Sequence, residues 1–256
     1  MRAAIIIPAR LESTRLPGKL LLAETGTPLI CHTVERAANI RDASGGMFTQ
    51  VLVAADDQRI VRAVERENAE RGWDARAVLT DIGHQSGSDR IAEVAAGLDG
   101  GVDAILNLQG DEPEVPVAGV LALGEFFREV ACDIATMVYP LETPEDKRNP
   151  ALVKAVLGNG GRAMYFSRAE IPFRRDEGDF TPPTYGHVGI YLYKREALER
   201  FVSLPQGRLE QTEKLEQLRA LENGMTIAAM VMDQKPPKGI DTPEDYAEFV
   251  RTAGTN

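Results

Sequence analysis

The strongest constraint on the fold is an alternation of short apolar runs and amphipathic helical patterns through the first 140 residues. The runs are strand-sized, rich in β-branched or other apolar residues, and end in turn residues or Asp. Strands that alternate with helices are joined by crossovers, so the sheet is expected to be mainly parallel with helices on both faces. The strands are expected at 2–8, 49–56, 75–80, 103–110 and 132–140, and the helices at 27–40, 56–72, 86–100 and 116–130.

The alternation loosens after residue 140. Strand patterns occur at 151–157, 185–193 and 225–232, a helical pattern at 209–224, and a capped terminal helix at 242–252. No repeat, low-complexity tract or linker interrupts the chain. One domain over residues 1–256 is therefore expected, with the later half extending or covering the edge of the sheet.

Composition excludes several classes of protein. The chain has 256 residues, of which 43% are hydrophobic, and a formal net charge of −10. Such a charge repels nucleic acid and anionic membranes, and the longest apolar stretches are only strand-sized. The N-terminus has no secretory pattern, and Cys31 and Cys132 lie in mostly apolar segments without a C-x-x-C motif. We expect a cytoplasmic protein with reduced cysteines, no nucleic-acid partner and no membrane insertion.

Three cations follow the first expected strand. Arg10, Arg15 and Lys19 surround the turn at Pro17-Gly18, where an α/β sheet presents ligands at the carboxyl ends of its strands. Guanidinium forks and an ammonium group suit a polyphosphate, although loop cations are more often solvated surface charge. Neither G-x-x-x-x-G-K-[ST] nor a G-x-G-x-x-G after the first strand is present, so a P-loop and an ordinary dinucleotide site do not fit.

Two acidic segments complete a candidate site. Gln109, Asp111 and Glu112 follow the fourth strand, and a carboxylate there can hold Mg²⁺ together with phosphate oxygens, although Asp-Glu-Pro alone is usually a turn. Gly110 between them permits a close backbone approach to a ligand. Asp241 precedes the last helix and is explained as an N-cap, but Thr242 caps equally well and frees Asp241 for a metal.

Seven segments in order resemble one known family nearly from end to end. They are IIIPARLESTRLPGK (5–19), HQSGSDR (84–90), NLQGDEP (107–113), YFSRAEIP (165–172), HVGIY (187–191), LEQLR (215–219) and GIDTPED (239–245). The chain is therefore similar to the 3-deoxy-manno-octulosonate (Kdo) cytidylyltransferases, which activate a sugar acid for lipopolysaccharide synthesis. The resemblance implies an α/β, Rossmann-like three-layer nucleotidyltransferase fold with a mainly parallel central sheet. It also implies a homodimer, with the sugar-pocket and dimerisation elements mainly in 140–224.

The resemblance implies a reaction and its residues. CMP passes from CTP to the anomeric hydroxyl of the sugar acid with Mg²⁺ as cofactor, and pyrophosphate leaves. The catalytic residues are Arg15, Lys19, Asp111 and Asp241, of which Asp111 and Asp241 hold the metal. The CTP-binding residues are Pro8, Ala9, Arg10, Ser13, Arg15, Lys19, Ser88, Arg90 and Gln109. The sugar-binding residues are Gln109, Arg168, His187, Tyr191, Glu216 and Gln217.

Simpler explanations exist for several of these residues. Arg90 suits a helix-surface ion pair with Glu93, and His187 with Tyr191, four apart on one strand face, suits a satisfied core pair. Glu216 and Gln217, with Glu213, suit a solvated helix stripe.

Departures from the family pattern bear on the sugar. Glu12 lies inside the cationic loop, and Arg208 and Leu192 replace residues that are commonly Pro and a small residue. They leave open whether the sugar is Kdo or an amino-substituted relative. Two other classes also stay open: a sugar-1-phosphate nucleotidyltransferase and a non-catalytic nucleotide-sensing protein. Release of pyrophosphate separates the three.

Overall fold

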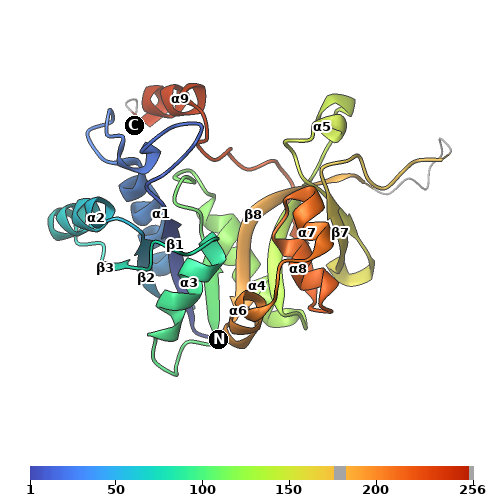
Figure 1. Ribbon diagram of the computed structural model, residues 1–256, viewed down its shortest axis with the longest axis horizontal. Coiled ribbons are helices and arrows are strands. Elements are labelled where there is room, and N and C mark those ends of the chain that lie inside the picture. Colours follow the sequence, from blue (N-terminus) through green and yellow to red (C-terminus); the bar gives the residue numbers. More distant parts are fainter. Residues whose placement is uncertain (176–182, 254–256) are drawn as a thin grey trace. The chain divides into compact units, whose positions relative to one another are not determined.

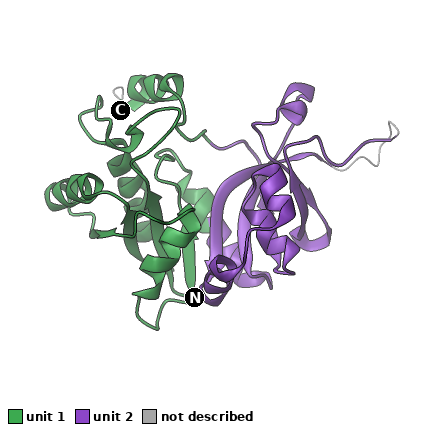
Figure 2. Ribbon diagram, viewed as in Figure 1, with its two compact units in different colours: residues 1–121, 237–256 green, residues 122–236 purple. Residues whose placement is uncertain are grey.

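The computed structural model describes residues 1–175 and 183–253. The chain divides into two compact units, residues 1–121 with 237–256 and residues 122–236 (Figure 2). Helix α4 (Val117–Glu129) runs across the boundary in sequence. The division does not test whether the units fold as one domain, so the single domain over 1–256 stays a prediction.

The first unit contains the parallel sheet that the alternation predicts. Its strands are β1 (Ala3–Ala9), β2 (Phe48–Ala55), β3 (Ala75–Leu79) and β4 (Ala104–Asn107), in the order β3-β2-β1-β4 with every neighbouring pair parallel. Every residue of β1 is buried, as expected of a strand covered on both faces (Figure 1).

This strand order fixes where a ligand binds. From β1 the chain moves outward to β2 and β3, and then returns to β4 on the other side of β1. Right-handed crossovers then require the helix between β3 and β4 to cover the opposite face from the two helices before it. The direction of winding reverses between β1 and β4, and the crevice outside their carboxyl ends is the expected binding site.

The helices of the first unit match the expected ones apart from their ends. They are α1 (Leu29–Ala43), α2 (Gln58–Arg71), α3 (Gly87–Ala96) and α9 (Pro243–Ala253), with a 3-10 turn η1 (Lys19–Leu21) after the cationic loop.

Local chemistry explains where α2 and α3 begin and end. The Asp57 carboxylate accepts from the Arg59 N–H at the start of α2, and Gly72, with φ of 69°, ends it in the left-handed region. Ser86 and Asp89 form a capping box at the start of α3. Helix α3 ends at Ala96, earlier than the expected residue 100.

The second unit is built around β5 (Ile134–Pro140). This strand pairs antiparallel with β8 (Tyr185–Lys194) and parallel with β9 (Ile227–Val231). Strand β6 (Lys154–Leu157) pairs antiparallel with β7 (Ala163–Ser167) and with β8. The fold is thus mixed α/β, parallel throughout the sheet of the first unit and largely antiparallel here.

The expected single helix over 209–224 is wrong. It is two helices, α7 (Arg208–Glu213) and α8 (Gln217–Glu222), because Lys214 adopts a left-handed φ of 54° that ends the first. The sequence patterns also missed four elements of the second unit: α5 (Pro144–Arg148), η2 (Asn159–Gly161), β7 and α6 (Arg195–Ser203).

Candidate active site

A pocket of about 330 Å³ lies in the first unit between the loop after β1 and the loop after β4. This is the place that the reversal of winding indicates. Its lining includes eight residues that sequence analysis assigned to the site: Pro8, Arg10, Ser13, Arg15, Lys19, Gln109, Asp111 and Asp241.

Lys19 joins the three segments of this site. Its buried Nζ donates to Asp111 Oδ2 at 2.5 Å, Asp241 Oδ1 at 3.0 Å and the Ile240 carbonyl oxygen at 2.9 Å. Burial alone lowers the pKa of Lys19, but the charges and hydrogen bonds of the two carboxylates outweigh it and raise the pKa. Lys19 is therefore positively charged, and both acidic segments converge on it.

Asp241 is not the cap of the last helix. The Thr242 hydroxyl accepts from the Asp245 N–H at 3.2 Å, and the Asp245 carboxylate accepts from the Thr242 N–H at 2.9 Å. The Asp241 carboxylate faces Arg15 Nη2 at 2.9 Å and Lys19 instead. The prediction that Thr242 caps the helix is confirmed.

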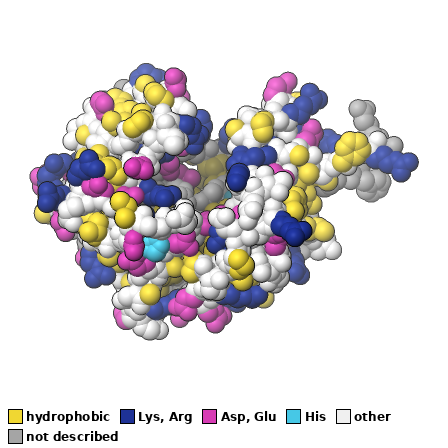
Figure 3. All heavy atoms as spheres, viewed as in Figure 1, with side chains coloured by type: hydrophobic (Ala, Val, Ile, Leu, Met, Phe, Trp, Pro, Cys, Tyr) yellow, Lys and Arg dark blue, Asp and Glu magenta, His cyan; other side chains and the backbone are white. Residues whose placement is uncertain are grey.

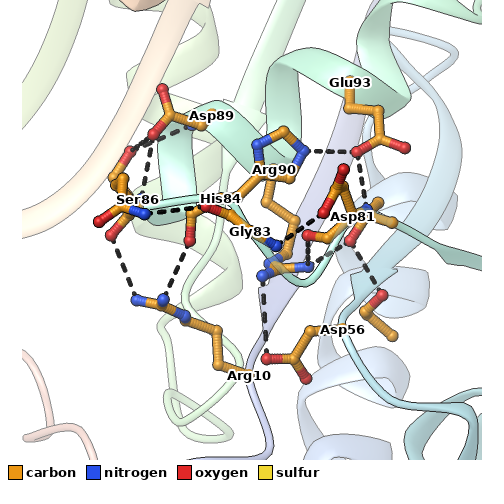
Figure 4. A network of polar contacts seen from close by, with 12 residues as sticks. Arg10, Asp56, Asp81, Gly83, His84, Ser86, Asp89, Arg90 and Glu93 are labelled. Carbon is orange, nitrogen blue, oxygen red and sulfur yellow. Dashed lines mark hydrogen bonds and ion pairs between the residues drawn. The ribbon is translucent and has the colours of Figure 1, made fainter.

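Arg10 is held by the segment that precedes α3. Its guanidinium donates to the carbonyl oxygens of His84, at 3.1 Å, and Gln85, at 3.4 Å (Figure 4). His84 Nε2 in turn lies 2.5 Å from Glu93 Oε2, and this hydrogen bond lowers the pKa of Glu93. Glu12, the unusual anion of the loop, is exposed and lines the pocket.

Glu112 belongs to the acidic segment that sequence analysis placed after the fourth strand, but it was not among the expected metal ligands and does not line the pocket. Burial, together with the charges of Asp111 and Asp241, raises its pKa to about 8. The Cβ of an alanine at Gly239 would lie 3.3 Å from its Cγ, so the segment before Asp241 packs directly on it.

Gly110 lines the pocket, and internal packing gives a further reason for a glycine at this position. A Cβ here would lie 3.0 Å from the Pro8 carbonyl oxygen and 3.1 Å from Ile30 Cδ1. The glycine therefore permits close approach to the protein's own backbone. Gln109 beside it donates to Asn107 Oδ1 at 3.0 Å.

Three residues expected to bind CTP lie outside the lining of this pocket: Ala9, Ser88 and Arg90 are all buried. The alternative of a surface ion pair between Arg90 and Glu93 is wrong, because the Arg90 side chain is 0% exposed. Gly87, Thr14 and Leu20 line the pocket and were not predicted. Gly87 is the first residue of α3, whose capping box is visible in the sequence.

His187 and Tyr191 share one face of β8, as their spacing predicts. Their ring centroids are 5.4 Å apart, and His187 lies 4.9 Å from the Phe166 ring. His187 Nε2 lies 3.0 Å from Thr136 Oγ1. Burial lowers the pKa of His187 to about 3, so its imidazole is neutral at neutral pH.

Arg168 is fixed by backbone acceptors. Its Nε donates to the Glu213 carbonyl oxygen at 2.8 Å and its Nη1 to the Pro150 carbonyl oxygen at 3.0 Å. The Glu213 carboxylate accepts from the Arg168 N–H at 2.9 Å and from the Ser167 hydroxyl at 2.6 Å. Glu213 therefore packs against β7 and is not part of a solvated stripe.

Glu216 and Gln217 lie at the start of α8, and Gln217 is buried. The helix is held by Arg219, whose guanidinium donates to both Glu210 carboxylate oxygens at 2.9 Å and 2.6 Å. Glu216 lies 3.6 Å from the same arginine. Leu192, one of the departures from the family pattern, is fully buried in β8.

The chemistry of Asp111 and Asp241 suits a divalent cation. Both place an oxygen on a single cationic atom, Lys19 Nζ. Within residues 1–175 and 183–253, no group of three or more His, Cys, Asp or Glu side chains could hold a metal ion. Two carboxylates nonetheless fit Mg²⁺, which usually completes its shell with water and phosphate oxygens.

Comparison with known proteins agrees on one family. A sequence model described as cytidylyltransferase matches residues 4–227. The 3-deoxy-manno-octulosonate cytidylyltransferase of Syntrophobacter fumaroxidans is 44% identical over 98% of this chain and 96% of its own length. That of Mesorhizobium japonicum is 45% identical over all of both chains. A solved structure of CMP:2-keto-3-deoxy-manno-octonic acid synthetase complexed with CTP superposes with a TM-score of 0.88, at 35% identity, over 100% of this chain and 99% of that one.

Proposed function

Because this chain belongs to the 3-deoxy-manno-octulosonate cytidylyltransferase family, we propose that it transfers CMP from CTP to the anomeric hydroxyl of Kdo or a close 3-deoxy sugar acid. The observation that carries the proposal is the convergence of Asp111 and Asp241 on Lys19, beside Arg15, in one pocket. These residues come from three distant segments, and local structure does not require them to meet.

The pocket supplies the electrostatics of phosphoryl transfer. Arg10, Arg15 and Lys19 bind and orient the triphosphate oxygens and withdraw charge from the α-phosphate. The anomeric oxygen then forms a bond to the α-phosphorus as the bond to the bridging oxygen breaks, its proton passes to solvent, and pyrophosphate leaves. No covalent intermediate on the protein is needed.

Mg²⁺ is the proposed cofactor, with Asp111 and Asp241 as its protein ligands. When bound, it neutralises charge on the transferring phosphoryl group and on the departing pyrophosphate. In the second unit, Arg168, His187, Tyr191, Glu216 and Gln217 are proposed to bind the carboxylate and hydroxyls of the sugar acid. Fixed partners such as the Glu213 carbonyl oxygen on Arg168 favour a preorganised site.

A homodimer and a cytoplasmic location are also proposed. Large apolar side chains are exposed in the second unit, among them Met164 at 64% and Phe173 at 89%, and burial in a partner would remove them from water. Sedimentation equilibrium tests the dimer.

The free, buried Cys31 and Cys132 agree with the proposed cytoplasmic location, which is a reducing compartment. Within the part of the chain that the structure describes, no helix is both long and apolar enough to cross a bilayer.

Pyrophosphate release tests the proposed reaction. The protein is incubated with Mg²⁺ and CTP together with Kdo, an amino-substituted Kdo, sialic acid or a sugar 1-phosphate. Release with a 3-deoxy sugar acid alone is expected, and the ratio of kcat/KM values identifies which one. Release with a sugar phosphate alone would favour the sugar-1-phosphate class, and no release at all would favour a nucleotide sensor.

Base choice is a second test of the same proposal. CTP is expected to be preferred over UTP, since cytosine presents an amino donor where uracil presents a carbonyl. Backbone acceptors from Pro8 to Arg10, where β1 ends, are the proposed partners for that donor. Equal kcat/KM values for CTP and UTP would contradict the assignment of CTP as the nucleotide.

A further inference from the structure

The carboxylate of Asp56 joins the cationic loop, residues 10–19, to a buried arginine. Asp56 follows β2 and is not in the lining of the pocket. Its Oδ1 accepts from the Leu11 N–H at 2.9 Å, where the cationic loop leaves β1. Its Oδ2 lies 3.8 Å from Arg90 Nη2 (Figure 4). The two oxygens of one side chain therefore face two different parts of the structure.

Arg90 needs a counter-charge inside the protein. Its side chain is fully buried, and its Nη1 donates to the Thr80 hydroxyl and to the Asp81 carbonyl oxygen at 3.2 Å. Among the described residues, its Nε and Nη2 have no hydrogen-bond partner. A buried cation is costly unless an anion lies near it, and the Asp56 carboxylate, itself only 10% exposed, supplies that anion.

Hydrogen bonds of Asp56 and Thr80 join the ends of three strands, β1, β2 and β3. The Asp56 N–H donates to the Ala9 carbonyl oxygen at 3.1 Å, and the Thr80 N–H and hydroxyl donate to the Ala55 carbonyl oxygen at 2.8 and 2.9 Å. Arg90, from α3, thus contacts the segments that follow β2 and β3, while Asp56 extends the connection to the loop after β1.

We propose that Asp56 is a positioning residue for the triphosphate site and that Arg90 acts through it. Asp56 fixes the start of the cationic loop by holding the Leu11 N–H, and the charge of Arg90 fixes Asp56. Neither side chain is in the lining of the pocket, so both set the placement of Arg10, Arg15 and Lys19 without touching the nucleotide. What the loop binds rests on the proposed function.

Asp56→Ala and Asp56→Asn separate the two contacts. Alanine removes both, whereas asparagine keeps an oxygen for the Leu11 N–H and loses the charge that faces Arg90. Asp57→Asn is the matched control, because Asp57 is the neighbouring carboxylate and contacts Arg59 on the exposed side of α2. All variants are compared with the wild type by thermal unfolding before binding is measured.

Two measurements follow. Calorimetric titration with CTP is expected to show a Kd raised on the order of 10-fold or more by Asp56→Ala, less by Asp56→Asn, and little changed by Asp57→Asn. Amide hydrogen exchange is expected to be faster at Leu11 in Asp56→Ala and close to wild type in Asp57→Asn. If Asp56→Ala fails to fold, Asp56→Asn provides the binding comparison.

A double variant tests the coupling to Arg90. Since Arg90 acts through Asp56, adding Asp56→Asn to Arg90→Met is expected to change the CTP Kd less than it does in the wild type. Equal effects in both backgrounds, an unchanged Kd in both Asp56 variants, or unchanged exchange at Leu11 would each overturn the inference. Hydrogen exchange needs neither CTP nor turnover, so its result is independent of whether the proposed function holds.

Discussion

Lys19 connects two parts of the site that the sequence analysis treated separately. It was expected to hold phosphate, and Asp111 and Asp241 were expected to hold a metal, yet the structure places its ammonium on both carboxylates. The proposed divalent cation would therefore compete with the ammonium for the same oxygens. Replacing the ammonium by a divalent cation on these oxygens would make the net charge of the pocket more positive.

Removing one carboxylate should impair turnover more than folding. Asp111→Asn and Asp241→Asn each leave Lys19 one charged partner, so the fold is expected to persist. The value of kcat is expected to fall on the order of 10²-fold, as when one preorganised electrostatic contact is lost. Pyrophosphate release across a Mg²⁺ titration measures this, with Glu114→Gln, a nearby exposed acid, as the control. Wild-type rates and wild-type Mg²⁺ dependence would defeat the shared-metal proposal.

The cations of the loop should control nucleotide affinity. Arg15→Ala and Lys19→Ala are each expected to raise the CTP Kd by roughly 10-fold or more, because a charge-assisted phosphate contact is lost. Arg59→Ala is the matched control, since Arg59 is an exposed arginine that pairs with Asp57. Calorimetry decides the matter. An unchanged Kd in both loop variants would remove the loop from the site.

At the scale of elements, the bounds of helices were predicted best from the sequence where a local pattern and the tertiary fold agree. Helix α2 has its Asp57 cap and its Gly72 stop in the printed sequence, and both act as such. The expected single helix over 209–224 is interrupted by the left-handed turn at Lys214. The pair between Glu210 and Arg219 then holds the two resulting helices together. A charged pattern with helical spacing does not reveal that its charges are buried.

That buried pair should contribute strongly to stability. The Glu210 and Arg219 side chains are only 8% and 5% exposed, and they join α7 to α8. Glu210→Gln or Arg219→Met is expected to lower the free energy of unfolding by about 3–5 kcal/mol, because each removes one member of a buried ion pair. Urea denaturation measures the change. Replacing both residues with apolar ones should cost less than the two single changes added together, and simple additivity would contradict the pairing.

Strand β8 should make stability depend on pH through His187. Its folded pKa of about 3 lies below the ordinary value of 6.5, so the unfolded state binds the proton more readily. The contribution is therefore fully present above about pH 6.5 and is lost as pH falls toward 3. From pH 7.5 to 5.5, the wild type is expected to lose about 1 kcal/mol more than His187→Gln in urea denaturation. Equal losses would contradict the neutral imidazole.

At the scale of the whole molecule, charge of both signs is mixed. Figure 3 shows acidic and basic side chains interspersed over the face it presents, so the net charge of −10 does not form one uniform patch there. Affinity for CTP is therefore expected to depend on local cations acting against an unfavourable overall charge.

Salt should weaken nucleotide binding. Raising the NaCl concentration screens the contacts between the exposed Arg10 and Arg15 and the triphosphate, so the CTP Kd is expected to rise steadily. The dependence should be shallower in Arg15→Ala, which has one such contact fewer. Calorimetry at several salt concentrations tests this, and an affinity independent of salt would contradict an electrostatic site.

Periodicity predicted the sheet of the first unit, and the carboxyl ends of its strands indicated Arg10, Arg15, Lys19, Gln109 and Asp111. Pro8, Ser13 and the metal-binding role of Asp241 came from the family resemblance. The sequence did not predict that Lys19 pairs with both acids, or that Arg90 turns away from the pocket toward Asp56. The placement of these two side chains depends on the balance between the cost of burying a charge and the gain from pairing it with an opposite charge. Residues far apart in the chain set that balance, and no local pattern records it.

The contact between Lys19 and Asp241 spans 222 positions and has a consequence for synthesis. A growing chain emerges from the ribosome with its cationic loop first, and the Asp241 carboxylate and Ile240 carbonyl that hold Lys19 arrive only after the whole second unit has been made. Until then Lys19 has neither of these partners. Chains that terminate before residue 237 lack Ile240 and Asp241 and are therefore expected to lack a working nucleotide pocket.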